Sequence, residues 1–174
     1  MATGDAGAAI SLRPATAADW GLIRGWLALP EIQRWWGNLA SAEAEMRLAF
    51  ETPSALCRII EADGTPIGYA HAMDATFWGT DLPEGMPAGT WDADLFIAAP
   101  EHRGKGAGRT ALRLLAEEVF STTLAVAISV FASIKNEAAV RAYEQAGFRW
   151  VRVWDDPVFG PSWLMLLERD AVRR

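Results

Sequence analysis

The sequence has few of the residues that mark disulfide-bonded, metal-binding or membrane proteins. Cys57 is its only cysteine, which excludes an intrachain disulfide, and its two histidines, His71 and His102, have no metal-ligand spacing to each other or to Cys57. No run approaches the roughly 18 apolar residues of a membrane span, and residues 1–10 lack the basic region and the long apolar core of a signal peptide. We therefore expect a cytoplasmic protein without a metal ion or a membrane partner.

Positive charge is also scarce. Lysine and arginine number 16 against 22 aspartates and glutamates, for a formal net charge of -6 and an isoelectric point near 4.9. This balance argues against a nucleic-acid partner and favours a small cationic one. The 174 residues are 51% hydrophobic, enough for the core of one domain over residues 1–174, with residues 1–7 as a flexible tail. The composition leaves monomer and homodimer open.

Residues 91–120 carry the most informative pattern, which predicts a strand, a glycine-rich turn and a helix. In the first part, apolar residues alternate with Asp92, Asp94 and Phe96, as in a strand with two different faces. In the last part, one apolar stripe has helical spacing; its members are Leu112, Leu115, Ala116, Val119 and Phe120. Residues 103–109 are therefore expected to join the end of a strand to the start of a helix.

The turn at residues 103–109 is suited to hold a phosphate group. Gly104, Gly106 and Gly108 remove side chains where a ligand would approach the backbone, and the free amides at a helix start, that of Ala107 included, carry partial positive charge. Three side chains add positive charge: Arg103, Lys105 and Arg109. The spacing differs from that of a Walker loop and from the dinucleotide-binding G-x-G-x-x-G, so neither is indicated.

Local patterns elsewhere predict the other elements. Strands are predicted over residues 10–14, 55–61, 67–73, 124–131, 148–154 and 162–168. Helices are predicted from Ala17 to Pro30, over residues 42–50 and from Asn136 to Ala146, with caps at Thr16, Ser41 and Asn136. The aromatic segment 31–37 has no predicted element. Asp63-Gly64 predicts a tight hairpin, and residues 74–90 predict a long functional loop.

Two motifs resemble the signatures of the GNAT superfamily of acyl-CoA-dependent N-acyltransferases. They are Arg103-x-x-Gly106-x-Gly108 and Asn136-x-x-Ala139-x-x-x-Tyr143-x-x-x-Gly147-Phe148. The element order β-α-α-β-β-β-α-β-α-β-β is also that of the GNAT fold, an α/β (α+β) arrangement with helices on both faces of a mixed, mostly antiparallel sheet. The resemblance covers most of the chain.

This resemblance implies acetyl-CoA as the co-substrate. In the family, the loop amides hold the CoA pyrophosphate, which corresponds here to residues 103–109. The pantetheine arm lies along the preceding strand, here Leu95, Phe96 and Ile97. The helix that begins at Asn136 follows the same arm, and its Tyr143 is placed near the thioester sulfur, where it would protonate the leaving thiolate.

Within the superfamily, the chain resembles the aminoglycoside 6′-N-acetyltransferases at IQRWWG (residues 32–37), PIGYA (residues 66–70) and Asp94. In that branch a tryptophan of the WWG segment stacks on the drug, and an aspartate at the Asp94 position meets the amine. The resemblance therefore implies Trp36 as a wall of the acceptor site and Asp94 as the catalytic base. Further residues suited to a polycationic acceptor are Glu51, Trp78, Asp155 and Asp156.

Other interpretations stay open. Asp92 is interpreted as a solvated strand residue, and a packing role suits Trp35 and Trp36 equally well. The branch has a further aspartate where this chain has Phe131, so the acceptor could be another small amine, such as a siderophore hydroxylysine precursor or a polyamine. A non-catalytic acyl-CoA-binding module is the remaining alternative. Direct acetyl transfer to the 6′-amine of an aminoglycoside is the function that the residues favour.

Overall fold

The computed structural model describes residues 7–79, 81–157 and 159–172, so the predicted tail at residues 1–7 lies, apart from Gly7, outside the described residues. The described chain forms a seven-stranded sheet in the order β1-β2-β3-β4-β5-β7-β6, antiparallel except where β4 meets β5. The strands are β1 (Ile10–Pro14), β2 (Leu56–Ala62), β3 (Thr65–Asp74), β4 (Thr90–Ile97), β5 (Ala127–Ser133), β6 (Arg149–Asp156) and β7 (Gly160–Glu168). The predicted fold class is confirmed.

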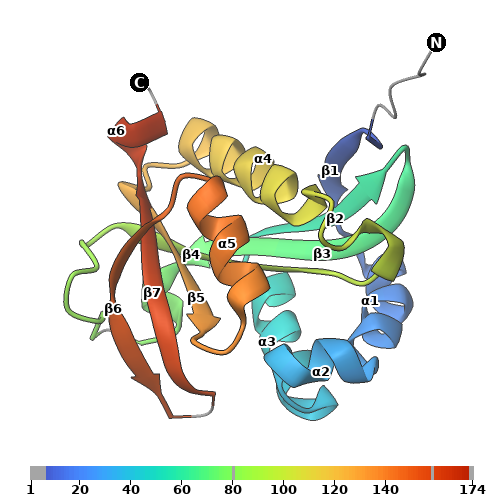
Figure 1. The fold of residues 1–174 in the computed structure, drawn as a ribbon, viewed down its shortest axis with the longest axis horizontal. Helices are drawn as coiled ribbons and strands as arrows, with labels where there is room; N and C mark the ends of the chain where they lie inside the picture. The colour runs from blue at the N-terminus through green and yellow to red at the C-terminus, as the bar shows by residue number, and fades with distance from the viewer. Residues whose placement is uncertain (1–6, 80, 158, 173–174) are drawn as a thin grey trace.

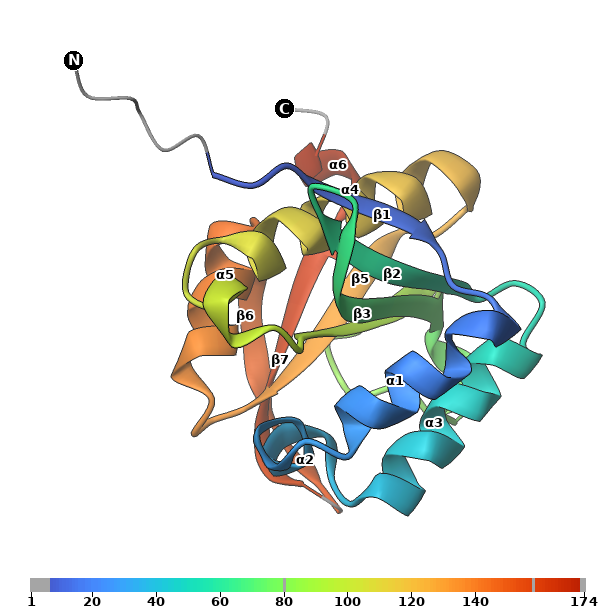
Figure 2. The same ribbon diagram turned by 90° about the vertical axis from the view of Figure 1, so that its right-hand side faces the viewer.

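Helices cover both faces of the sheet (Figures 1 and 2). The α-helices are α1 (Trp20–Leu27), α2 (Pro30–Trp36), α3 (Leu39–Glu51), α4 (Ala107–Thr122), α5 (Glu137–Gln145) and α6 (Arg169–Val172). Short 3-10 turns span Ala17–Asp19, Ala75–Phe77 and Pro100–His102. The first three helices and the α4–α5 pair contribute to two separate apolar clusters, one on each face of the sheet. The alternation along β3 and β4 explains this, because successive side chains point to opposite faces.

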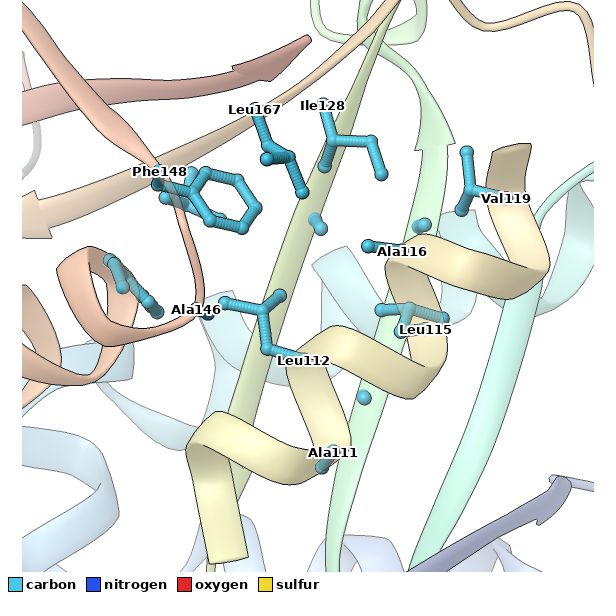
Figure 3. Close-up of a cluster of buried hydrophobic side chains, with 14 of the residues drawn as sticks. Ala111, Leu112, Leu115, Ala116, Val119, Ile128, Ala146, Phe148 and Leu167 are labelled. Atoms are coloured by element: carbon cyan, nitrogen blue, oxygen red, sulfur yellow. The ribbon is translucent and has the colours of Figure 1, made fainter. Parts of the chain in front are cut away.

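The predicted apolar stripe of α4 forms the centre of one cluster (Figure 3). Leu112, Leu115, Ala116 and Val119 are each at most 2% exposed, because their helical spacing turns them all toward the sheet. They meet side chains from β5, from the residue just before β6 and from β7; those labelled in Figure 3 are Ile128, Phe148 and Leu167. This packing fixes the start of α4, and with it the glycine-rich turn, against the end of β4.

Three local predictions need correction. Pro30 does not only end a helix: it begins α2, because its fixed φ and missing N–H suit the first helical position. The cap of α3 is Asn38, whose side chain accepts a hydrogen bond from the Ser41 amide at 3.0 Å, so that helix starts earlier than predicted. The apolar run from Leu124 is not all strand, since Leu124 is 95% exposed and β5 begins at Ala127.

The β2–β3 hairpin follows its prediction. Asp63 and Gly64 both have positive φ, at 49° and 79°, which the tight turns of hairpins require and which aspartate and glycine tolerate. The hairpin brings β3 beside β4, where His71 pairs with Asp94 and Tyr69 with Phe96. Directly opposed residues of an antiparallel pair share a face, so these four side chains point to the same side.

The sheet opens between β4 and β5. Their parallel pairing covers only three positions, Thr90 with Ala127, Trp91 with Ile128 and Asp92 with Ser129. Beyond that point β4 pairs only with β3, and β5 continues beside β7. Figure 1 shows the two strands diverging. The backbone of β4 after Asp92 therefore has one edge without a neighbouring strand.

Candidate functional site

The gap between the diverging strands belongs to a cavity of about 1470 Å³. Its lining comes from the glycine-rich turn and α5 on one side, and from α2, α3, β4 and the β6–β7 turn on the other. Among the described residues, no group of three histidine, cysteine, aspartate or glutamate side chains has the arrangement of a metal site. Nor does any described helix have the length and apolar character needed to cross a membrane. The cavity is the candidate site.

The glycine-rich turn forms one end of this cavity. Gly104 and Gly106 have φ of 69° and 87°, a left-handed conformation that side chains disfavour, and Gly106 is the residue before α4. A Cβ added at Gly106 would lie 3.2 Å from Arg109 Nη2. The first amides of α4 have no carbonyl one turn earlier to bond, so they and the helix dipole present positive charge. The turn can hold an anionic group through its backbone.

The predicted cationic side chains behave differently from one another. Arg103 lines the cavity, but its guanidinium donates to the carbonyls of Ile97 (2.7 Å) and Ala98 (2.8 Å), which ties the turn to the end of β4. Arg109 lines the cavity and donates to Gln145 at 3.4 Å. Lys105 is exposed and outside the lining. The main role of Arg103 in this structure is therefore to shape the turn.

Helix α5 lines the cavity on the same side as the glycine-rich turn. Asn136 lines the cavity, and its side chain accepts a hydrogen bond from the Ala139 amide at 3.2 Å, which confirms it as the cap of α5. Tyr143 also lines the cavity and is 5% exposed. Burial, and then the charges of Asp94 and Asp92, raise the pKa of Tyr143 well above its usual value. Its hydroxyl is therefore protonated at neutral pH and able to donate.

Acidic side chains gather on the other side of the cavity. Asp92 and Asp94 stand on the same face of β4, Glu45 comes from α3 and Asp156 from the end of β6, and all four line the cavity. Burial, followed by repulsion from Glu45 and Asp92, raises the pKa of Asp94 well above its usual value. Burial is also the main cause that raises the pKa of Asp92 to about 7. Burial, and then Asp92 and Asp156, raise the pKa of Glu45 to about 7.

Each aspartate of β4 has a specific hydrogen bond. Asp94 Oδ1 accepts from the Leu95 amide at 2.8 Å, which favours its charged form and partly opposes the effect of burial. Asp92 Oδ1 accepts from Ser129 Oγ at 2.8 Å, across the last paired position of β4 and β5. The two carboxylates are thus held within the cavity, and at pH 7 the cluster retains protons that isolated carboxylates would have lost.

An aromatic and imidazole wall stands behind these acids. His71, opposite Asp94 in the sheet, is fully buried, with Nε2 3.8 Å from Glu45 Oε1. Burial lowers the pKa of His71 to about 4, so the ring is neutral at pH 7. Trp36 meets His71 edge-on at 6.0 Å and Phe96 at 5.2 Å between ring centroids. Trp36 is 6% exposed and also lines the cavity, so it packs in the hydrophobic core and forms part of the cavity wall.

The structure brings together most, not all, of the residues singled out in the sequence. Trp78 is 44% exposed and lines the cavity together with Asp156, whereas Glu51 and Asp155 are exposed and outside the lining. Gly104, Gly106 and Gly108 line it beside Leu95, Phe96 and Ile97, while the side chain of Ala107 is buried in the core.

Two acids that line the cavity, Glu45 and Asp92, were missed, and so was His71, which is buried behind them. A signal existed for Glu45, because it lies three residues after Ala42 and four before Ala49, on the buried face of α3. A signal existed also for Asp92, which shares a strand face with Asp94. Nothing in the local sequence indicated that His71 faces Glu45, since α3 and β3 meet only in the folded chain.

Comparisons with known proteins agree with this geometry. A family model described as "Acetyltransferase (GNAT) domain" matches residues 15–156. The proteins named aminoglycoside N(6')-acetyltransferase type 1 from Klebsiella pneumoniae and from Serratia marcescens are each 31% identical to this chain over 176 residues, which covers 95% of this chain and 86% of theirs.

Solved structures show the same fold. The structure of AAC(6')-Ib with coenzyme A and kanamycin matches with a TM-score of 0.82 and 30% identity, over 95% of this chain and 98% of that one. Its complex with ribostamycin and coenzyme A matches with a TM-score of 0.82 and 29% identity, over 95% and 97%. A spermidine N-acetyltransferase from Vibrio cholerae, 17% identical with a TM-score of 0.74 over 95% and 98% of the chains, shares the fold alone.

Proposed function

Because this chain belongs to the acetyltransferase (GNAT) family, we propose that it transfers the acetyl group of acetyl-CoA to a primary amine of a polycationic small molecule, the 6′-amine of an aminoglycoside. The observation that carries the proposal is the pairing of an anion-binding turn with a cluster of carboxylates in one cavity. We also propose that one domain performs the whole reaction, since both sides line that cavity, and that it works in the cytoplasm, where acetyl-CoA is available.

The residues of the cofactor side fit acetyl-CoA. The amides of residues 104–109 would hold its pyrophosphate, since the left-handed glycines clear the space above them. The unpaired edge of β4 at Leu95, Phe96 and Ile97 offers backbone groups to the amides of the pantetheine arm, as an added strand would use them. Bound there, acetyl-CoA supplies a thioester as the acetyl donor. Arg109 and Asn136 line the same stretch.

The acceptor side fits an ammonium compound. A primary amine is mostly protonated at pH 7, whereas only its neutral form is a nucleophile. Asp94 would bind the ammonium and then take its proton, directly or through water, which its raised pKa favours. Trp36 and Trp78 give the cavity flat walls for the apolar faces of sugar rings. The two matched structures of AAC(6')-Ib hold the aminoglycosides ribostamycin and kanamycin.

The Leu95 amide links the two sides of the reaction. It donates to Asp94 in this structure, so the carboxylate occupies a donor that could otherwise polarise a thioester carbonyl. When an ammonium group draws Asp94 away, the Leu95 amide becomes available to polarise that carbonyl. Tyr143, protonated and buried, would then give its proton to the leaving thiolate. Transfer is direct, with no covalent intermediate on the protein.

A thiol-release assay with acetyl-CoA tests the proposal. We expect thiol release with kanamycin and other drugs that carry a 6′-amine, and none with 6′-hydroxyl analogues, because a hydroxyl is a weaker nucleophile and forms no ammonium–carboxylate contact. Equal turnover on both sets would show that another position is acetylated. Release only with hydroxylysine or with polyamines would replace the acceptor class, and failure to bind acetyl-CoA in calorimetry would leave a non-catalytic module.

A further inference from the structure

We propose that Asp92 and Glu45 form a second cation subsite beside Asp94, so that the acceptor is held through two ammonium groups and only the one at Asp94 is acetylated. The inference rests on the proposed function, because it states which charge pattern the acceptor presents to the same cavity. It assigns roles to two carboxylates that the chemistry of transfer itself does not use.

The position of Asp92 supports a binding role. It stands two residues before Asp94 on the same face of β4, which places the two residues roughly 6.6 Å apart along the strand, a suitable separation for two neighbouring ammonium groups. Ser129 Oγ holds its carboxylate at 2.8 Å, at the last paired position before β4 and β5 separate. Asp92 is therefore fixed at the inner end of the opening in the sheet and lines the cavity.

The charges around the subsite are not balanced by the protein. Among residues 7–79, 81–157 and 159–172, no lysine or arginine forms an ion pair with Glu45, Asp92 or Asp94. The base nearest to Glu45 is His71, at 3.8 Å, and its burial keeps it neutral at pH 7. A cation that enters the cavity would therefore meet several carboxylates whose mutual repulsion it relieves.

His71 gives a second, independent indication of a ligand. Its side chain is fully buried, and neither ring nitrogen has a hydrogen-bond partner among the described residues. A neutral imidazole has one donor and one acceptor nitrogen, and burial without partners is unfavourable for both. Nε2 faces the Glu45 carboxylate across 3.8 Å, too long for a hydrogen bond. A ligand bound at Glu45 that shifts its carboxylate toward His71 would satisfy this nitrogen.

Calorimetry with spermidine, a simple polyammonium probe, tests the subsite without requiring turnover. We expect Asp92→Asn and Glu45→Gln each to raise the Kd for spermidine about tenfold. The control is Asp170→Asn, which removes the same charge from an exposed position of α6 outside the cavity and should change the Kd less than twofold. With kanamycin and acetyl-CoA, Asp92→Asn should raise KM about tenfold and change kcat less than threefold, while the KM for acetyl-CoA stays constant.

The outcomes separate the subsite from the proposed function. If kanamycin is acetylated but Asp92→Asn and Glu45→Gln behave like Asp170→Asn, the subsite is wrong and the function stands. If spermidine binds and both variants weaken its binding, but no aminoglycoside is acetylated, the subsite stands and the acceptor is wrong. Wild-type protein that does not bind spermidine at all would overturn the subsite. Unchanged melting curves at pH 4, where both acids are protonated in the folded protein, show that the variants are folded.

Discussion

The two sides of the cavity are suited to ligands of opposite charge, and each by different means. The cofactor side uses backbone amides of one contiguous segment, residues 95–109, which the packing of α4 holds in place. The acceptor side is lined by side chains from α2, α3, β4 and β6, which converge only in the folded chain. The amides on the cofactor side carry partial positive charge whether or not an anion is bound. The carboxylates on the acceptor side are different, because burial disfavours their charged forms until a cation binds.

This difference extends to stability. The turn on the cofactor side is satisfied internally, because Arg103 donates to two carbonyls at the end of β4. On the acceptor side, burial and then Glu45 raise the pKa of Asp94, and burial and then Asp92 raise that of Glu45. Neither ring nitrogen of His71 has a hydrogen-bond partner among the described residues. Strain of this kind is common at binding sites, where function is retained at the expense of stability. Three substitutions test whether a change on one side of the cavity leaves the function of the other side intact.

The largest effect is expected from Gly106→Asp, which acts on the cofactor side alone. It adds a side chain at a φ of 87°, 3.2 Å from Arg109 Nη2, and puts a negative charge where a pyrophosphate would bind. We expect acetyl-CoA binding in calorimetry to fall below detection. Gly64→Asp is the matched control, since it has a φ of 79° in a hairpin turn with open space around it, and it should bind normally. Unaltered binding in Gly106→Asp would place the pyrophosphate elsewhere.

A smaller effect is expected from Asp94→Asn, on the acceptor side. Loss of a positioned base should lower kcat about 100-fold with the best amine acceptor and leave the Kd for acetyl-CoA unchanged. Because the pKa of Asp94 is raised, wild-type kcat/KM should increase with pH as the acid cluster loses its protons, and the variant should lose that part of the profile. Wild-type turnover in the variant would exclude Asp94 as the base.

The smallest effect is expected from Asp92→Asn, measured as thermal stability against pH. The pKa of Asp92 is raised from 3.8 to about 7, so between these values the folded protein holds a proton that the unfolded chain has lost. The stability that this group contributes is therefore fully present below about pH 4 and is lost as the pH rises to about 7. Above that pH the free energy of unfolding no longer changes with the titration of Asp92.

The variant should accordingly equal the wild type at pH 4 and be more stable at pH 8. Since Asp92 is partly exposed and water screens it, we expect about 1–2 kcal/mol, or a melting temperature higher by about 2–6 °C. His71 has the opposite trend, because its pKa is lowered to about 4, but it is present in both proteins and cancels in the difference. If the two proteins differed in melting temperature by the same amount at all pH values, the pKa of Asp92 would not be raised in the folded protein.

The cofactor side could be predicted closely, because its chemistry depends on neighbours in the sequence. The glycines of residues 104–108, the apolar stripe of α4 and the cap at Asn136 are local patterns, and each appears in the structure where it was predicted. The predicted roles of those residues toward acetyl-CoA stay predictions. Local patterns failed where a signal had two meanings: Pro30 both follows one helix and begins another, and an apolar residue such as Leu124 can be left in solvent.

The acceptor side shows what only the tertiary structure decided. Sequence reasoning chose Glu51, Trp78, Asp155 and Asp156 by charge or ring type, yet two of these four stand outside the cavity. The sequence by itself determined the order of the elements and the turn before α4, because helical and strand periodicity and glycine conformation act over a few residues. The fold alone placed Glu45 beside His71 and Asp92 beside Ser129, since long-range pairing of strands and packing of α3 decide which acids share one low-dielectric pocket.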